Sequence, residues 1–180
     1  MDSETCVSGY MEHLEIDGQI GPDSTEALSR LLPKLPKCID GDGTWLANRV
    51  YLSSRGGLLS DGFALGRLFR KYQMETVITY GQECSSSCAI AFLGGIYRSM
   101  RDDAKLMFHA PYTTNQYWDR VAIDCSDYGQ VSDLADYYKF ALGAEAGNYL
   151  KDRTMSYCSR SDGWTLNADG AQLLGLLNDG

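Results

Sequence analysis

Three short segments of the chain combine residue types that hydrolytic enzymes use. Gly56 and Gly57 follow a predicted strand, and a backbone without Cβ atoms can turn its N–H groups toward an anion. Ser86 lies where a predicted strand turns into a helix, beside N–H groups that the helix leaves unsatisfied. His109 ends a predicted strand, and imidazole titrates near neutral pH, as a general base requires. Together the segments predict attack on a carbonyl, with a backbone site for the oxyanion.

Each segment alone has a simpler interpretation. The glycines could form an ordinary turn, the run Ser85, Ser86 and Ser87 could cap a helix, and the histidine could be a hydrogen-bonded residue at the rim of the core. Their order along the chain is more specific. His109 follows Ser86 after one helix and one connection, which predicts that the two lie on neighbouring strands of one sheet.

The elements that must position these segments alternate between strand and helix. Strands are predicted at Glu12 to Asp17, Arg49 to Ser53, Glu75 to Tyr80 and Lys105 to His109. Helices are predicted from Pro22 to Leu32, from Asp61 to Tyr72 and from Ala89 to Leu93, with further helices from Tyr128 to Met155 and from Asp169 to Leu177. This alternation implies a largely parallel sheet with right-handed crossovers, whose functional loops gather beyond the carboxyl ends of the strands.

Composition limits the class of protein. With 180 residues and 44% hydrophobic content, we expect one domain over residues 1–180, with core β/α units at 14–111 and a mostly helical part at 112–180. A net charge of -8 argues against a nucleic-acid partner. No apolar run is long enough to predict a membrane span, and the start at Met1 to Glu4 lacks the features of a signal peptide.

The six cysteines form an even set, which is expected if they pair in an oxidising compartment. Position suggests two pairs, Cys84 with Cys88 and Cys125 with Cys158, although buried free thiols would be an alternative. Pairing would indicate a periplasmic or otherwise exported protein whose leader has been removed; without pairing, a cytoplasmic location is expected. Cys84, Cys88 and His109 could instead bind a metal, but this set lacks a persuasive fourth ligand.

In this order the three segments resemble those of the Clp protease proteolytic subunit and its crotonase-fold relatives, and most of all exported Clp-protease-like proteins of bacteria. Those relatives carry Ser-Pro-Gly-Gly after a strand, then a nucleophilic serine with small residues opening a helix, then a histidine after a strand. The matching segments here are Ser54-Arg55-Gly56-Gly57, Ser86-Ser87-Cys88-Ala89 and His109-Ala110-Pro111, and Leu14 to Ile20 is similar to the opening strand. The resemblance implies an α/β fold with repeated β-α units, a largely parallel sheet and a helical C-terminal third.

The same resemblance implies a serine peptidase that acts on peptides or unfolded polypeptide, as a homo-oligomer and without a cofactor. Ser86 would be the nucleophile and His109 its base, while the N–H groups of Gly57 and Ser87 would bind the oxyanion and Gly56 would support that loop. Ser86 is preferred to Ser85 because exported relatives show a Cys-x-Ser-small-Cys pattern centred on this position.

The third catalytic residue is the weakest part of the match. The relatives orient their histidine with an aspartate on a later helix, and Asp152 is the candidate here, ahead of Asp162 and Ser156. Without an orienting acid, a catalytic dyad is conceivable. Two other functions stay open: acyl-CoA chemistry, for which the chain has no evident basic phosphate site, and a non-catalytic interaction module on a decayed site.

Overall fold

A computed structural model describes residues 13–39, 42–43, 45–117 and 120–178. The expectations for Met1 to Glu4, Cys6 and Glu12 lie outside these residues. Within them, none of the helices combines the length and the apolar character that crossing a bilayer requires.

Four parallel strands form the central sheet in the order β1-β4-β5-β7. Their bounds are β1 (His13–Asp17), β4 (Arg49–Ser53), β5 (Glu75–Ile78) and β7 (Tyr97–Met100). The first three agree with the predicted strands, because each carries buried apolar residues between turn residues. The fourth was missed: Arg98 lies within β7, buried, and its guanidinium donates to the carbonyls of Leu176 and Gly95. Burial lowers the pKa of Arg98 to about 10.

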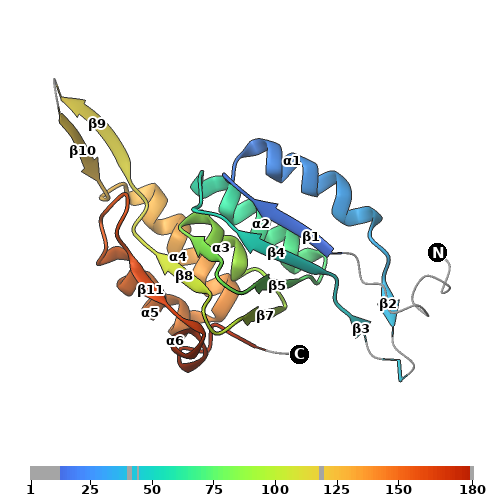
Figure 1. Cartoon of the computed structure of the whole chain (residues 1–180). Coiled ribbons are helices and arrows are strands. Elements are labelled where there is room, and N and C mark those ends of the chain that lie inside the picture. The colour runs from blue at the N-terminus through green and yellow to red at the C-terminus, as the bar shows by residue number, and fades with distance from the viewer. Residues whose placement is uncertain (1–12, 40–41, 44, 118–119, 179–180) are drawn as a thin grey trace.

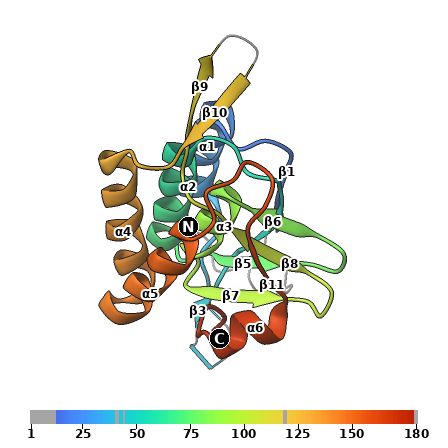
Figure 2. The ribbon, with the colours of Figure 1, turned by 90° about the vertical axis from the view of Figure 1, so that its left-hand side faces the viewer.

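Helices connect these strands and cover one side of them. Figure 2 shows α2, α4 and α5 gathered on one side, with β7, β8 and β11 on the other. The bounds of the helices are α1 (Pro22–Leu31), α2 (Leu59–Lys71), α3 (Ser87–Phe92), α4 (Tyr128–Leu142), α5 (Ala144–Met155) and α6 (Ala168–Leu173), with a 3₁₀ turn η2 (Leu32–Lys34). The largest side chains of the core, Tyr137, Tyr138, Phe69, Phe92 and Phe108, are fully buried between these layers.

A second sheet of three strands carries the residues that the sequence singles out. Its order is β11-β8-β6, with bounds β6 (Glu83–Ser85), β8 (Lys105–Phe108) and β11 (Trp164–Leu166). Strand β6 runs parallel to β8, and β11 runs antiparallel to it. The prediction of one sheet is therefore wrong in detail. A single bridge, Ser54 with Cys84, joins the end of β4 to this second sheet.

The C-terminal third contains helices, as predicted, and also strands that were not predicted. Residues 112–127 contain an antiparallel hairpin of β9 (Thr113–Tyr117) and β10 (Arg120–Asp124), which projects from the body in Figure 1. The stretch from Tyr128 to Met155, predicted to be mostly helical, forms α4 and α5, which are separated at Gly143, where φ is 86°. A short antiparallel pair, β2 (Cys38–Ile39) and β3 (Trp45–Leu46), lies in the stretch between α1 and β4.

Candidate active site

Ser86 occupies a strained turn between β6 and α3. Its backbone has φ 58° and ψ −124°, a conformation that residues with a Cβ rarely adopt. The turn is held because the Ser86 N–H donates to the carbonyl of Met107 at 2.9 Å. The side chain makes no capping hydrogen bond to α3, so the interpretation of this serine as a helix cap does not apply. Such a sharp strand-to-helix turn exposes a hydroxyl as a nucleophile.

The two neighbouring serines are arranged differently. Ser85 and Ser87 are buried, with 1% of each exposed, whereas Ser86 is partly exposed. The Ser85 hydroxyl donates to the carboxylate of Glu83. The Ser87 hydroxyl has no hydrogen-bond partner among the described residues. Of the three hydroxyls, that of Ser86 therefore best suits attack on a bound substrate.

Gly56 and Gly57 pass so close to their neighbours that no side chain fits. A Cβ on Gly56 would lie 2.7 Å from the Cβ of Ser86, and one on Gly57 would lie 1.9 Å from the Ile20 carbonyl oxygen. Both have positive φ, 99° and 158°. The Ile20 N–H donates to Gly56, and Leu58 donates back to Ile20, so this segment is held on both sides of Gly57. Gly56 thus lies directly against the serine turn, and its own N–H donates to the Ser54 hydroxyl at 3.0 Å.

His109 follows β8 directly, on the strand beside Ser86. The register of β6 and β8 pairs Ser85 with Met107, so the residues after the two strands emerge at the same end of the sheet. Ser86 and His109 thus follow neighbouring strands, but the strand before Ser86 is β6, which the sequence did not reveal. Tyr112 packs against the imidazole, with ring centroids 5.7 Å apart.

The Nδ1 atom of His109 lies 2.9 Å from the carbonyl oxygen of Ala110. A carbonyl oxygen can only accept, so in this contact Nδ1 carries the proton and Nε2 of the neutral ring is left as the acceptor. Nε2 is the nitrogen that takes the proton in serine hydrolases that use a histidine base.

The contacts of Asp152 lie on the exposed surface of α5. Its carboxylate pairs with Lys151 at 2.6 Å, and its side chain is 71% exposed on α5. Asp162 and Ser156, the weaker candidates, are engaged locally: Asp162 accepts from the N–H of Gly163, and the Ser156 hydroxyl donates to the backbone of Asp152. The hydrogen bond that the structure gives to the His109 ring is instead the one with the main-chain carbonyl of Ala110.

One cavity of about 400 Å³ is lined by three of the candidate residues, whereas Gly56, Ser87 and Asp152 are not part of its lining. Ser86, His109 and Gly57 line it, along with Arg55 and Arg160. Sequence reasoning missed Arg160, which lies in the loop after α5. Its placement depends on a long-range contact: the Tyr157 carbonyl in this loop accepts from the N–H of Ala110 at 2.9 Å, which holds the loop beside the histidine.

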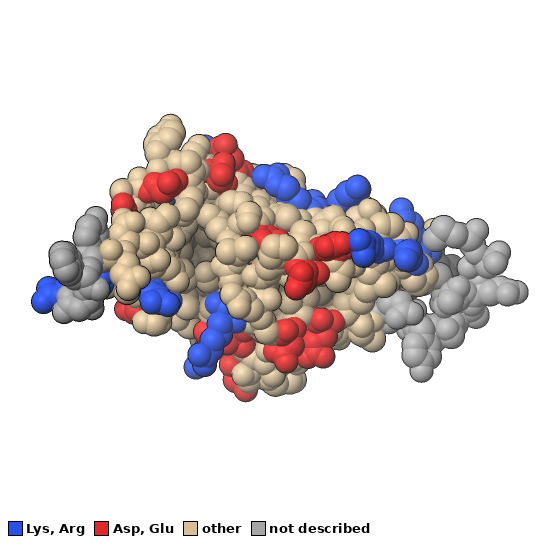
Figure 3. Space-filling model, turned by 90° about the horizontal axis from the view of Figure 1, so that it is seen from above, with Lys and Arg blue, Asp and Glu red and all other residues tan. Residues whose placement is uncertain are grey.

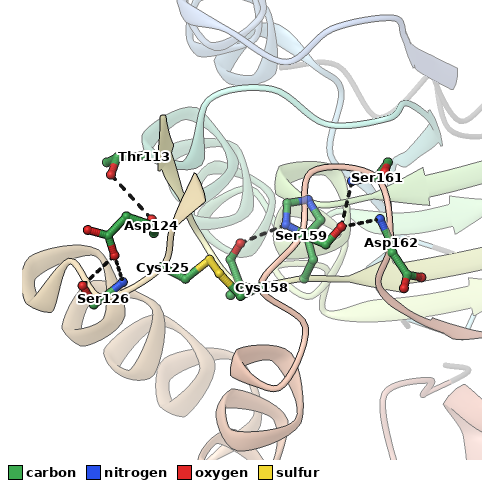
Figure 4. The surroundings of a disulfide bond; sticks show 10 residues. Thr113, Asp124, Cys125, Ser126, Cys158, Ser159, Ser161 and Asp162 are labelled. Atoms are coloured by element: carbon green, nitrogen blue, oxygen red, sulfur yellow. Dashed lines mark hydrogen bonds between the residues drawn. A yellow bond between two sulfur atoms is a disulfide. The ribbon is translucent and has the colours of Figure 1, made fainter. Parts of the chain in front are cut away.

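Two disulfides join the pairs that position suggests, Cys84 with Cys88 and Cys125 with Cys158. The first closes the turn around Ser86, and it rules out the proposed metal site, since neither sulfur is a free thiolate. The second ties the end of the hairpin to the loop after α5, as Figure 4 shows. No group of three or more metal-ligating side chains occurs in the described parts of the chain.

Charge on the molecule is mixed. In the view of Figure 3, lysine and arginine side chains lie among aspartate and glutamate instead of forming one continuous basic surface.

Comparison with known proteins gives a fold but no close relative. No protein-family model matches the sequence, and none of the curated proteins matches it either. Solved structures do match. A mutant of the 1510-N membrane-bound stomatin-specific protease superposes with a TM-score of 0.68 at 14% identity, over 93% of this chain and 77% of that one. ClpP1 from Listeria monocytogenes superposes with a TM-score of 0.64 at 15% identity, over 93% and 89%. The chain therefore has the ClpP-like, crotonase-type α/β fold that these two proteases share.

Proposed function

We propose that the chain is a serine peptidase in which Ser86 is the nucleophile and His109 the general base. The observation that carries the proposal is the single cavity lined by Ser86, His109 and Gly57, with Ser86 held in a strained turn. The similar structures named above are those of proteases, and a second form of the stomatin-specific protease, also similar to this chain, is in complex with a substrate peptide.

The proposed reaction uses two residues that line the cavity, Ser86 and His109, together with backbone N–H groups beside the serine turn. Nε2 of His109 takes the proton of the Ser86 hydroxyl as Oγ bonds to the peptide carbonyl carbon. The oxyanion receives hydrogen bonds from the N–H groups of Gly57 and Ser87, the latter in the first turn of α3, where a helix has no internal acceptor. His109 then gives its proton to the leaving amine, and water hydrolyses the acyl-enzyme.

In this proposal the carbonyl of Ala110 orients the His109 ring, which is the role expected of Asp152. It fixes the tautomer and the orientation of the ring, but it carries no negative charge to stabilise the imidazolium that forms. A dyad of this kind is slower than a triad with an aspartate, and a mutation at Asp152 should leave the reaction intact.

The experiment is labelling with a fluorophosphonate probe, followed by mass spectrometry of the modified peptide. We expect wild type and Ser85→Ala to be labelled on Ser86 and Ser86→Ala to be unlabelled. The labelling rate of His109→Gln should be lower than that of wild type by a factor of about 10² or more. Ser85→Ala is the matched control, since it removes the adjacent hydroxyl. Labelling that survives in Ser86→Ala would refute the assignment, and absence of labelling in wild type would favour a non-catalytic interaction module on the same fold.

We also propose that the protein is exported and forms a homo-oligomer. The two disulfides support an oxidising compartment. Self-association is supported by exposed apolar side chains at one groove, where Leu173 is 88% exposed and Tyr149 is 50% exposed. Light scattering coupled to size-exclusion chromatography tests the oligomer, and a monomer at micromolar concentration would refute it.

A further inference from the structure

The cavity that holds Ser86 and His109 has a positive lining in an acidic protein. Arg55 and Arg160 line it, and no aspartate or glutamate is among the described residues of its wall. The chain as a whole carries 24 acidic residues against 16 basic ones. A wall with two arginines and no carboxylate is therefore a local departure from the composition of the chain.

Both guanidinium groups are available to a ligand. Within the described ranges, neither Arg55 nor Arg160 takes part in an ion pair, a side-chain hydrogen bond or a cation-π contact, and both residues are exposed. Other arginines of the chain are engaged: Arg49 pairs with Glu75 at 2.6 Å. Arg98 is bonded to main-chain carbonyls.

The two arginines reach the site from different segments. Arg55 directly precedes Gly56 and Gly57, so it flanks the proposed oxyanion hole. Arg160 follows Tyr157, whose carbonyl binds the N–H of Ala110 next to the proposed base. A substrate at Ser86 would thus lie between one guanidinium on the glycine side and another on the histidine side.

The carboxylates near the site lie in an adjoining cavity. This second cavity, of about 650 Å³, shares Arg55 and Gly57 with the first and is also lined by Asp17 and Glu83. A bound chain that crosses the glycines therefore meets positive charge in the Ser86 cavity and mixed charge in the next one. Opposite charges favour binding and like charges disfavour it, so the two cavities differ in the side chains that they accept.

We propose that the Ser86 cavity selects peptides that place a carboxylate in it, bound by Arg55 and Arg160. The proposal names the substrate class of the peptidase inferred above and rests on that function for catalysis, but the binding step can be measured alone. The carboxylate can come from an acidic side chain or from the free carboxyl terminus of a peptide. Arginine suits either, because its planar group binds a carboxylate through two parallel hydrogen bonds.

Four probes test this proposal with the Ser86→Ala protein, which binds without cleavage. They are peptides of alternating alanine and glutamate that carry an uncharged fluorophore, the same peptides with glutamine in place of glutamate, and each of these with a free or an amidated carboxyl terminus. We expect fluorescence anisotropy to show tighter binding of the carboxylate-bearing probes. If the glutamate peptides bind more tightly than the glutamine peptides with either terminus, the cavity recognises acidic side chains. If only the peptides with a free carboxyl terminus bind more tightly, the cavity recognises the terminal carboxylate. Equal binding of all four overturns the proposal.

Variants locate the preference. Arg160→Gln or Arg55→Gln, each made in the Ser86→Ala background, should reduce the ratio of affinities between acidic and neutral probes about tenfold, as loss of one charge-assisted hydrogen bond does. Arg30→Gln is the control of equal charge change, since Arg30 lies on α1 in a surface pair with Glu26. A tenfold loss in Arg30→Gln as well would show general charge attraction and overturn the assignment. Fluorophosphonate labelling of Ser86 reads the proposed catalytic function separately, so either idea can fail alone.

Discussion

The disulfide between Cys125 and Cys158 should contribute about 4 kcal/mol to the free energy of unfolding. The two residues are 33 positions apart, and cross-linking a loop of that length removes roughly 12 cal/mol/K of entropy from the unfolded chain. Cys158 is exposed and Cys125 is only partly buried, so serine at these positions adds little cost of its own. For a chain of this size, such a loss lowers Tm by about 10 °C.

Thermal unfolding of three variants, followed by circular dichroism without reductant, checks this value. Cys125→Ser, Cys158→Ser and the double variant should all melt about 10 °C below wild type, because each removes the same bond. The two single variants thus serve as controls for the substituted side chains. A double variant that melts within roughly 2 °C of wild type would refute the reasoning. It would show that the end of the hairpin and the loop after α5 stay together without the cross-link.

Two further predictions concern single residues. The free energy of unfolding should be about 1 kcal/mol higher for Ser86→Gly than for Ser86→Ala, because glycine adopts a φ of 58° without strain. The strain that is relieved exceeds the larger entropy that glycine loses on folding. Urea unfolding measures the difference, and equal stability of the two variants would contradict the strain. Ser126→Ala should raise the pKa of Asp124, which hydrogen bonds from the Ser126 hydroxyl and N–H hold below its usual value. Any stability that these bonds give is present at pH values above the ordinary Asp pKa, and it is lost as the pH falls through the pKa that Asp124 has in the folded protein. An NMR titration in which the pKa of Asp124 is the same in wild type and Ser126→Ala would contradict this prediction.

The sequence predicted the elements whose signals are local. The apolar residues of β4 and α2 and the proline at the start of α1 set those elements within about two residues, as strong periodicity and capping allow. The pairing of Cys84 with Cys88 was also suggested by short spacing. These features depend on neighbours in the chain, so one sequence is sufficient to find them.

The missed features depend on distant partners. Strand β6 has only three residues, with the polar Glu83 and Ser85, and it is a strand because β8 lies beside it. The partner of the His109 ring is a main-chain carbonyl, which leaves no signature in residue types. The side chain of Asp152 is exposed because its position on α5 is not on the buried face of the helix. Predicting that exposure requires knowledge of how α5 packs.

The position of β8 has a consequence for the order in which the candidate site can assemble during synthesis. Strand β8 is the middle strand of its sheet, with β6 on one side and β11, from near the C-terminal end of the described residues, on the other. The turn at Ser86 is itself held by a bond to Met107 of this strand. A chain emerging from the ribosome therefore cannot form the serine turn until β8 has followed, and the sheet around the histidine is complete only after residue 166. We conclude that partly synthesised chains lack the assembled site.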